Sequence, residues 1–469
     1  MTRRRYVVAI DGGSQSTKVL IVDENGVVHS SAQRRLKPTE SPSPGHVVHP
    51  GDDLWDSIVD ACHEALAGFT GDRSRIVGVG LCTIRFCRAL LDEHGQLVEP
   101  VLSWMDVRVS RAHVHDPRVR YVTTSSGYLG HRLTGRFVDT VANLQGVWPV
   151  DEENWGWSTD PEAYERTGMM REQLFDLVLP GAPLGTITAD AAAATGLPAG
   201  LTVYATANDK AVEALGSGLR DEDTVLLSLG TYIAAMTTGS LVSVEHDDVW
   251  MNFASEPHRF LYESGGIRRG MWTVSWWREL LDNGTGLTDD ELGRGARAVA
   301  PGSDGLFAVL DWLAPGDAPY RRGALIGFDG RQGRFHIYRA ILEGIALTMR
   351  RHIDAMEETL GRRFEHVIVS GGGSRSDLVM WILAAVLERP VRRNRLTDAA
   401  GMGSAICALV GAGVYPDWDA AVAATVHPGE TWDVDPHGAL AYRPIRDAYA
   451  LLPVHLDPLF QELDTIACR

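Results

Sequence analysis

The chain has 469 residues, more than one hydrophobic core usually supports, and therefore predicts two domains. Its residues are 45% hydrophobic and 22% charged, as in ordinary globular proteins, and the net charge of -17 argues against binding nucleic acid or an anionic membrane surface. No apolar run is long enough for a signal peptide or a spanning helix, and the five cysteines lack metal or redox spacing, so we expect a cytoplasmic protein with free thiols.

The chain opens with a predicted strand, a glycine-containing turn and a second strand. Apolar runs at 6–10 and 18–22 flank Gly12-Gly13-Ser14-Gln15-Ser16-Thr17. Further expected elements of the first half are a strand over 27–35, an amphipathic helix over 53–69, strands over 76–81 and 89–92, a helix over 123–133 and an irregular connection over 138–160.

The middle of the chain, 201–239, combines an acidic helix start with a second hairpin. An apolar run at 201–205 predicts a strand, and Asn208-Asp209-Lys210 opens a helix that ends at glycines near 216–218. Another strand, 225–229, ends in Gly230-Thr231 and turns back into 233–237. An acidic residue at the mouth of a helix, beside such a turn, suits a site that moves phosphate. We place the domain boundary near 217–224, which divides 1–220 from 221–469.

In the second half, a short strand is expected to lead into Gly371-Gly372-Gly373. The helices predicted here cover 270–281, 335–353, 377–387 and 398–410, with a partly broken helix over 447–466. YVVAIDGGSQSTKVLIVD and TVLLSLGTYIAAMTTG both predict a strand, a glycine-containing turn and a strand. Two copies of a phosphate-binding hairpin suggest a duplicated fold with a cleft between its halves.

A series of motifs gives this pattern a more specific meaning. In chain order they are IDGGSQSTK at 10–18, SWMDVR at 103–108, ATANDKAVEALGSG at 205–218, SLGTYIAA at 228–235, RGALIGFDG and YRAILEGIALTMR within 322–350, VSGGGSRSDLVMWILAAVLERPV at 369–391 and DAAGMGSAICA at 398–408. In this order, over roughly residues 5–412, the chain resembles the FGGY family of carbohydrate kinases within the actin-like ATPase superfamily.

The resemblance implies an α/β fold of two ribonuclease H-like, actin-like ATPase domains with a deep cleft between them. It implies transfer of the γ-phosphoryl group of ATP, with Mg²⁺, to a hydroxyl of a small ketose or polyol, and we expect a pentulose such as xylulose. Glycerol, a tetritol or another polyol stays open as the acceptor, as does a non-catalytic sugar- or nucleotide-sensing protein of the same fold. Homodimers are common in the family, and the oligomeric state stays open.

Two acidic residues are expected to carry the chemistry. Phosphorylating a hydroxyl needs a carboxylate within hydrogen-bond reach of it. Locally, Asp209 suits that role and a helix cap equally, and the resemblance selects Asp209 as the base. Asp11, beside two glycines and several hydroxyl and amide side chains, is placed to hold Mg²⁺ through water, although a turn-initiating aspartate would look the same.

The resemblance also assigns the binding residues. The expected contacts to ATP are Gly13, Ser14, Gln15, Ser16 and Lys18 in the first hairpin, Gly230 and Thr231 in the second, and Gly372 and Ser376 beside the adenosine. Gln15 replaces a hydroxyl residue that is common in the family.

The acceptor is expected to contact Arg85, Phe86, Trp104, Asp106 and Asp209. Arg85 matches an arginine that glycerol kinases use on a substrate hydroxyl, whereas Phe86 departs from the Glu of glycerol kinases and the His of xylulokinases. Because the chain between Arg108 and Tyr121 is much shorter than in typical members, we expect a wider acceptor pocket or one completed by another subunit.

Overall fold

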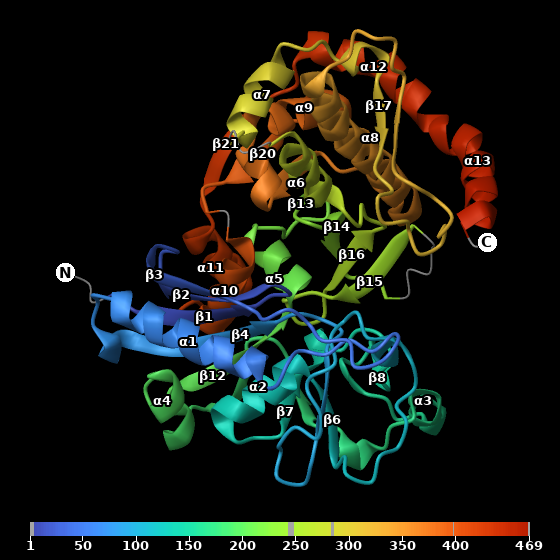
Figure 1. The fold of residues 1–469 in the computed structure, drawn as a ribbon. Coiled ribbons are helices and arrows are strands. Elements are labelled where there is room, and N and C mark those ends of the chain that lie inside the picture. The colour runs from blue at the N-terminus through green and yellow to red at the C-terminus, as the bar shows by residue number, and fades with distance from the viewer. Residues whose placement is uncertain (1–3, 243–247, 283–285, 397, 468–469) are drawn as a thin grey trace.

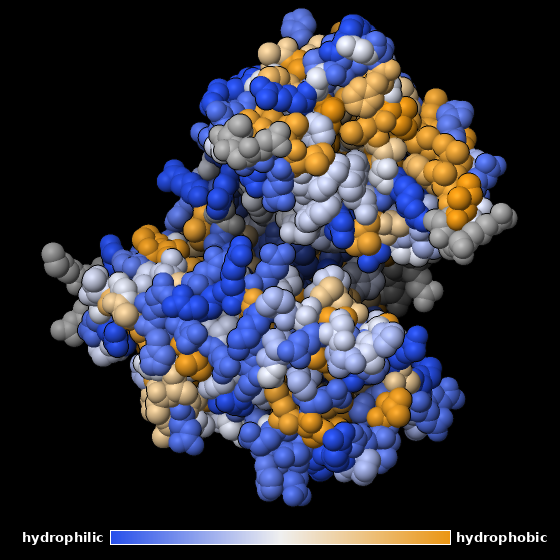
Figure 2. Space-filling view, in the orientation of Figure 1, coloured by the Kyte–Doolittle hydropathy of each residue, from blue (hydrophilic) through white to orange (hydrophobic). Residues whose placement is uncertain are grey.

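The computed structural model describes residues 4–242, 248–282, 286–396 and 398–467, which form two α/β halves, one above the other in Figure 1. The molecular surface is hollowed between the two halves (Figure 2). None of the helices among the described residues has the length and apolar character needed to cross a bilayer. The four described cysteines are buried and form no disulfide.

The first half is built on a six-stranded sheet in the order β11-β12-β4-β1-β2-β3. Its strands are β1 (Tyr6–Gly12), β2 (Ser16–Asp23), β3 (Val28–Arg35), β4 (Ile76–Thr83), β11 (Pro183–Thr186) and β12 (Thr202–Asn208). Strand β1 pairs antiparallel with β2 through the predicted turn and parallel with β4 on its other side.

Helices cover both faces of this sheet, which is why β1 is a continuous apolar run. Val8 and Ile10 of β1 join the core beneath α1 (Asp53–Gly68), α2 (Ser125–Thr134) and α4 (Ala189–Thr195). Val7 and Ala9 alternate to the opposite face and pack with α10 (Ala399–Gly411). Because α10 comes from the far end of the sequence, the division at residue 220 stays a prediction.

The second half is built on a seven-stranded sheet in the order β15-β16-β14-β13-β19-β20-β21. Its strands are β13 (Thr224–Leu229), β14 (Ile233–Gly239), β15 (Val249–Phe253), β16 (Phe260–Ser264), β19 (His366–Ser370), β20 (Val391–Asn394) and β21 (Pro428–Trp432). Strand β13 repeats the pairing of β1, antiparallel with β14 and parallel with β19.

The two sheets share one topology. Each has a central hairpin, an antiparallel strand outside its second strand (β3 or β16), two parallel strands on the other side and an antiparallel edge strand. Strand β15 is an addition to the second sheet. The duplication predicted from the two hairpins, and with it the α/β fold of two ribonuclease H-like domains, is confirmed.

The helix α8 (Arg334–Leu360) extends along the second half with one end close to β14 and β16, and it is longer than the sequence predicted. The other helices of this half are α6 (Gly270–Leu281), α7 (Asp289–Arg297), α9 (Asp377–Leu387), α11 (Trp418–Thr425), α12 (Pro436–Ala450) and α13 (Leu452–Ala467). The expected break in the terminal helix falls at Leu451, between α12 and α13.

The segments between these elements differ most from expectation. The helix expected from residue 123 begins at Ser125, because β6 (Tyr121–Thr124) pairs with β5 (Arg88–Leu91) up to Thr124, whose hydroxyl caps the helix. The connection expected to be irregular contains short pieces of structure: β7 (Val138–Thr140), β8 (Val150–Asp151) and β9 (Gly156–Trp157). The strands β10 (Asp176–Val178), β17 (Phe307–Val309) and β18 (Ala324–Ile326), and the helix α3 (Pro161–Thr167), complete the fold.

Candidate functional site

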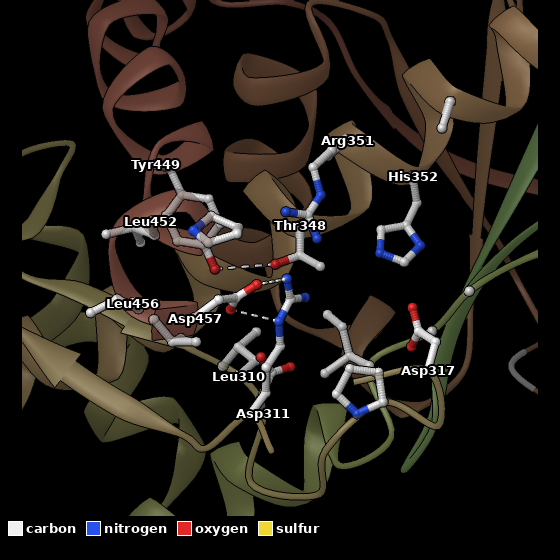
Figure 3. A pocket seen from close by; sticks show the side chains of 18 of the residues that line it. Leu310, Asp311, Asp317, Thr348, Arg351, His352, Tyr449, Leu452, Leu456 and Asp457 are labelled. Atoms are coloured by element: carbon white, nitrogen blue, oxygen red, sulfur yellow. Dashed lines mark hydrogen bonds and ion pairs between the residues drawn. The ribbon is translucent and has the colours of Figure 1, made fainter. Parts of the chain in front are cut away.

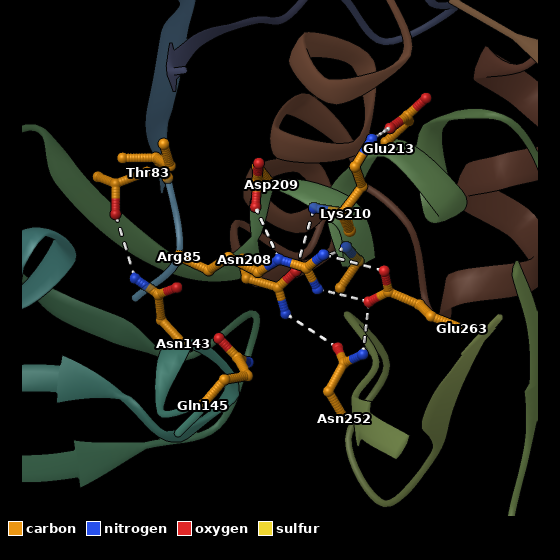
Figure 4. Close-up of polar contacts among 12 residues, drawn as sticks. Thr83, Arg85, Asn143, Gln145, Asn208, Asp209, Lys210, Glu213, Asn252 and Glu263 are labelled. Atoms are coloured by element: carbon orange, nitrogen blue, oxygen red, sulfur yellow. Dashed lines mark hydrogen bonds and ion pairs between the residues drawn. The ribbon is translucent and has the colours of Figure 1, made fainter. Parts of the chain in front are cut away.

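Polar side chains gather in two separate regions of the molecule. One is a cavity of about 380 Å³ in the second half, walled by α8, α13 and the chain that follows β17 (Figure 3). Arg321 is fixed there by two hydrogen bonds to Asp457, of 2.9 and 2.6 Å. None of the site residues predicted from the sequence lines this cavity. Two of those residues, Asp209 and Arg85, lie instead where the first half contacts Glu263 of the second (Figure 4).

Asp209 is the first residue of α5 (Asp209–Gly216), directly after β12. Asn208 is the cap of this helix, because its Oδ1 accepts hydrogen bonds from the backbone N–H groups of Lys210 and Ala211. The Asp209 carboxylate is therefore not needed as a cap. Its Oδ1 is buried without a hydrogen-bond partner, and the nearest cation is the Arg85 Nε at 3.9 Å. An unpaired carboxylate oxygen is available to accept a proton from a bound hydroxyl.

The surroundings of Asp209 push its pKa in opposite directions. Burial raises the pKa above the usual range of an aspartate, Arg85 and Lys210 lower it, and Glu263 and Glu213 raise it further. The net effect is an increase, so this carboxylate is more basic than one in water. That is the direction required of a general base that works near neutral pH.

Asp11 is the penultimate residue of β1, and only 8% of its surface is exposed. Burial first, and then the nearby Asp398, raise the pKa of Asp11 to about 7, while Lys18 opposes the rise. Lys18 Nζ lies 3.2 Å from Asp398 Oδ2, and Asp398 also caps α10. The negative charges of Asp209 and Glu213 also raise the pKa of Asp11. A buried carboxylate under repulsion from other acids fits a divalent cation, which would relieve that repulsion.

The first hairpin presents its turn to solvent beside Asp11. The Gly13 N–H donates to the Ser16 carbonyl at 3.1 Å, which closes the turn. Ser14 and Gln15 at its tip are exposed, and Ser16 Oγ accepts from the Gln33 side chain at 2.7 Å. The hydroxyl and amide groups that the sequence assigned to phosphate thus lie together on one turn.

The second hairpin and the glycine loop after β19 are packed against each other. Gly371 has a φ of 79°, and a Cβ at this residue would lie 2.6 Å from the Leu229 carbonyl. A Cβ at Gly373 would lie 2.9 Å from the side chains of Leu229 and Met271, so only glycine fits at both places. The start of α6 holds the other side of this hairpin, because the Gly270 N–H donates to the Thr231 carbonyl at 2.8 Å.

The remaining nucleotide candidates lie beside this contact. Gly230 precedes Thr231 in the hairpin turn, and its carbonyl accepts from the Met271 N–H at 3.2 Å. Gly372 has open space where a side chain would be, and Ser376 Oγ caps α9 by accepting from the Val379 N–H at 3.4 Å. The structure thus brings together the two segments that the sequence assigned to phosphate and adenosine.

Arg85 joins the two halves through an ion pair that crosses between them (Figure 4). Its Nη1 and Nη2 donate to the two carboxylate oxygens of Glu263 in β16, at 2.5 and 2.9 Å. Asn252 in β15 donates to the same carboxylate at 2.7 Å and accepts from the Asn208 side chain at 3.2 Å. A chain of polar contacts therefore runs from the second sheet to the residue before Asp209.

The other acceptor candidates are divided between two places. Phe86, whose φ of 66° is unusual for a bulky residue, stacks on Trp250 with ring centroids 5.7 Å apart. Trp250 also lies 4.8 Å beneath the Arg85 guanidinium. Trp104 lies on a separate loop with 46% of its surface exposed. Both carboxylate oxygens of Asp106 on that loop accept hydrogen bonds from Arg108, so this carboxylate stabilises the loop that carries it.

Several polar residues of the site were not predicted from the sequence. Asn143 and Gln145 are buried near Asn208, and each keeps a side-chain oxygen without a partner. Others surround α5 and the strands beside it: Lys210, Glu213, Ser228, Asn252, Glu263 and Ser370. For Glu213 a local signal existed, because it lies four residues after Asp209 and therefore on the same face of the helix.

Comparisons with known proteins support the same picture. The FGGY family of carbohydrate kinases matches in two parts, its N-terminal domain at residues 6–115 and its C-terminal domain at residues 225–412. The uncharacterized sugar kinase YgcE of Escherichia coli (strain K12) is 46% identical over 430 residues, which cover 89% of this chain and 87% of that protein.

Less similar proteins are named as kinases of a particular sugar. A xylulose kinase of Lactococcus lactis subsp. lactis (strain IL1403) is 25% identical over 474 residues, covering 90% of this chain and 91% of that protein. Among solved structures, the xylulose kinase from Rhodospirillum rubrum aligns with a TM-score of 0.85 at 25% identity, covering 97% of this chain and all of the other.

Proposed function

We propose that this protein phosphorylates a pentulose such as xylulose with ATP as the donor. The chain belongs to the FGGY family of carbohydrate kinases, whose members transfer a phosphoryl group to a hydroxyl acceptor. The xylulose kinases among its relatives and structural neighbours favour this acceptor. A glycerol- or tetritol-like polyol is the second candidate. It is favoured by Arg85, which matches the hydroxyl-binding arginine of glycerol kinases and lies beside Asp209.

Asp209 is the proposed base. The observation that carries this role is its buried Oδ1, which has no hydrogen-bond partner although Asn208 already caps the helix. A substrate hydroxyl bound beside α5 would donate to this carboxylate oxygen. It would transfer its proton there as the hydroxyl oxygen bonds to the γ-phosphorus and the bond from that phosphorus to ADP breaks. Arg85, 3.9 Å from this oxygen, acts to lower the pKa of Asp209 and so favours the ionised form that accepts the proton.

We assign ATP to the two hairpins and the glycine loop. The first hairpin contributes the turn that contains Gly13, Ser14, Gln15 and Ser16, together with Lys18, and the second contributes Gly230 and Thr231. Backbone N–H groups of such turns suit phosphate oxygens. Gly372 and Ser376 would lie against the adenosine.

The proposed metal ligand is Asp11. Mg²⁺ bound there, through water, would neutralise charge on the transferring phosphoryl group. Lys18 and Asp398 would stay paired beside it and hold the start of α10 in place.

Closure of the cleft would protect the reaction from water. Arg85 belongs to the first half and Glu263 to the second, so their ion pair forms only when the two halves are together. Water that reached the site would compete with the sugar hydroxyl and waste ATP. Phe86 and Trp250, which stack across the same contact, would form an apolar wall there.

The acceptor is identified by ADP release with Mg·ATP across a panel of pentuloses, hexuloses, polyols and sugar acids. We expect saturable turnover with one pentulose and little ADP release without acceptor. Preference for glycerol or a tetritol would select the second candidate. Steady ATP hydrolysis that ignores every acceptor would contradict the kinase function and favour a sensing ATPase.

A further inference from the structure

Glu213 lies one helical turn beyond Asp209 with 13% of its side chain exposed, and its carboxylate accepts hydrogen bonds from three different elements. Ser228 Oγ and Ser370 Oγ donate to Oε1 at 2.7 and 2.6 Å. Lys210 Nζ, from the same helix, donates to Oε2 at 2.8 Å, a contact drawn in Figure 4. These contacts satisfy both carboxylate oxygens.

The two serines lie at the carboxyl ends of neighbouring strands that lead into the nucleotide candidates: Ser228 is the penultimate residue of β13 and Ser370 is the last residue of β19. Ser228 of β13 and Ser370 of β19 are direct partners in the parallel register, so their hydroxyls lie side by side. Gly230 follows Ser228 by two residues, and Gly371 follows Ser370 immediately. One carboxylate therefore holds residues close to both the turn of the second hairpin and the glycine loop.

Lys210 keeps this carboxylate charged. Burial acts to raise the pKa of Glu213, but Lys210 and the two seryl hydroxyls outweigh it, and the pKa lies below the usual range. Lys210 Nζ also donates to Ser228 Oγ at 2.9 Å. A buried ion pair is weak evidence for stability, because desolvating its charges offsets much of their attraction. The Lys210–Glu213 ion pair is therefore better explained by a role in function than by a contribution to stability.

We propose that Glu213 is a positioning residue for phosphoryl transfer, which fixes both nucleotide loops against the helix that carries Asp209. This inference rests on the proposed kinase function. Asp209 and Glu213 are four residues apart on one short helix, so their separation is nearly rigid. The bonds from Ser228 and Ser370 to Glu213 then set the distance between the base and the phosphates that the loops bind.

The helix itself has a second anchor that does not involve Glu213. A Cβ on Gly216 would lie 1.9 Å from the Ala399 carbonyl, so α5 and α10 are in direct backbone contact there. Loss of the Glu213 carboxylate would therefore release the loops while α5 stays in place. This separates a positioning role from a purely structural one.

The test compares Glu213→Gln with Glu256→Gln, a control that removes a carboxylate paired with Arg220 outside both loops. Glutamine keeps the size of the side chain but removes its charge and replaces one of the two accepting oxygens by an NH2 group, which cannot accept from Lys210 or from a serine. Calorimetry with Mg·ADP and steady-state kinetics are measured on each variant. For Glu213→Gln we expect about tenfold weaker Mg·ADP binding and a similarly raised KM for ATP, with the acceptor KM little changed. Glu256→Gln should match the wild type.

Two variants of Ser370 test the Ser370–Glu213 hydrogen bond independently of the Glu213 variant. Ser370→Ala should weaken Mg·ADP binding in the same direction but less, and Ser370→Thr, which keeps the hydroxyl, should restore it. Unchanged Mg·ADP affinity in both Glu213→Gln and Ser370→Ala, or an acceptor KM raised as much as that for ATP, overturns the inference. A wild-type protein that binds Mg·ADP but phosphorylates no acceptor contradicts the proposed function instead, and the calorimetry still decides the role of Glu213.

Discussion

Neighbouring groups shift the pKa of the Asp209 carboxylate in opposite directions. Burial favours its neutral form, while Arg85 and Lys210 favour the ionised form that a base requires. The net pKa is raised, so as pH falls Asp209 should become protonated, and activity should be lost, at a higher pH than for an aspartate in water.

Replacing Arg85 tests this balance. In Arg85→Gln the pKa of Asp209 should rise further, because the cation that lowers it is gone and Glu263 loses its partner. The acid limb of the kcat/KM profile should then move to higher pH. Arg220→Gln, which removes an arginine paired with Glu256 and Asp419, is the control and should leave the limb in place. An unmoved or lower limb in Arg85→Gln would show that Arg85 does not act on the base.

Single residues were predictable where the signal was local. Asp209 was a candidate because it is an acidic residue at a helix start, and the resemblance selected it as the base. The structure gives the cap to Asn208, and the role of Asp209 as base stays a prediction. The partner of Arg85 was not predictable, because Glu263 lies 178 residues away in a strand that the sequence analysis did not identify. The Asp106–Arg108 pair was equally hidden, since the spacing alone does not show which carboxylates are already engaged.

At the scale of elements, the contact between α5 and α10 depends on glycines. A Cβ at Gly403 of α10 would lie 1.9 Å from the Val212 carbonyl of α5, and backbone cannot yield as a flexible side chain does. Asp209 begins α5 and Asp398 caps α10, so this contact fixes the helices that carry the two acids relative to each other.

Gly403→Ala should therefore destabilise the protein by about 2 kcal/mol or more, because the helices must move apart. Gly293→Ala is the matched control, since Gly293 also lies inside a helix, α7, but has open space where a Cβ would be. We expect that change to be neutral or to stabilise slightly, since alanine favours helix. Urea unfolding of both variants measures the difference, and equal stability would contradict the contact.

Helix α8 carries a histidine that should make stability depend on pH. Burial lowers the pKa of His352 to about 4, below its ordinary value near 6.5. The unfolded chain therefore binds a proton between these values when the folded one does not. Stability is fully present above pH 6.5 and is lost as pH falls toward 4.

Between pH 7.5 and pH 5 this histidine should remove about 2 kcal/mol from the free energy of unfolding. Urea unfolding at both pH values measures the loss. His352→Gln removes the titrating group, so its loss over the same interval should be smaller by that amount. Equal losses in the two proteins would mean that His352 is solvated in the folded state.

Helices and strands were predictable from the sequence where their pattern is local, and not where it depends on distant residues. The two hairpins have apolar runs on both sides of a glycine turn, a signal contained in a few neighbouring residues. Strands β15 and β16 were missed, although they supply Asn252 and Glu263 to the site. The packing of α10 on the first sheet joins residues nearly 400 positions apart, so no local pattern could show it.

At the scale of the whole molecule, one topology occurs twice and the site lies where its copies meet. The carboxyl ends of β4 and β12 carry Arg85 and Asp209, while those of β13 and β19 carry the second hairpin and the glycine loop. The acceptor candidates therefore belong to the first half, whereas the nucleotide candidates are divided, five in the first hairpin and four in the second half. Contacts from Arg85 to Glu263 and from Glu213 to Ser370 bind these sides together.

The most direct test of this account measures ADP and phosphorylated product together, with the best acceptor, for the wild type and for Asp209→Asn. Asp190→Asn, which changes an exposed first-turn aspartate of α4, is the control. We predict equal amounts of ADP and sugar phosphate from the wild type and the control, and a loss of about a thousandfold in Asp209→Asn with an unchanged melting temperature. Turnover by Asp209→Asn close to that of the wild type, or ADP formed without sugar phosphate, would contradict it.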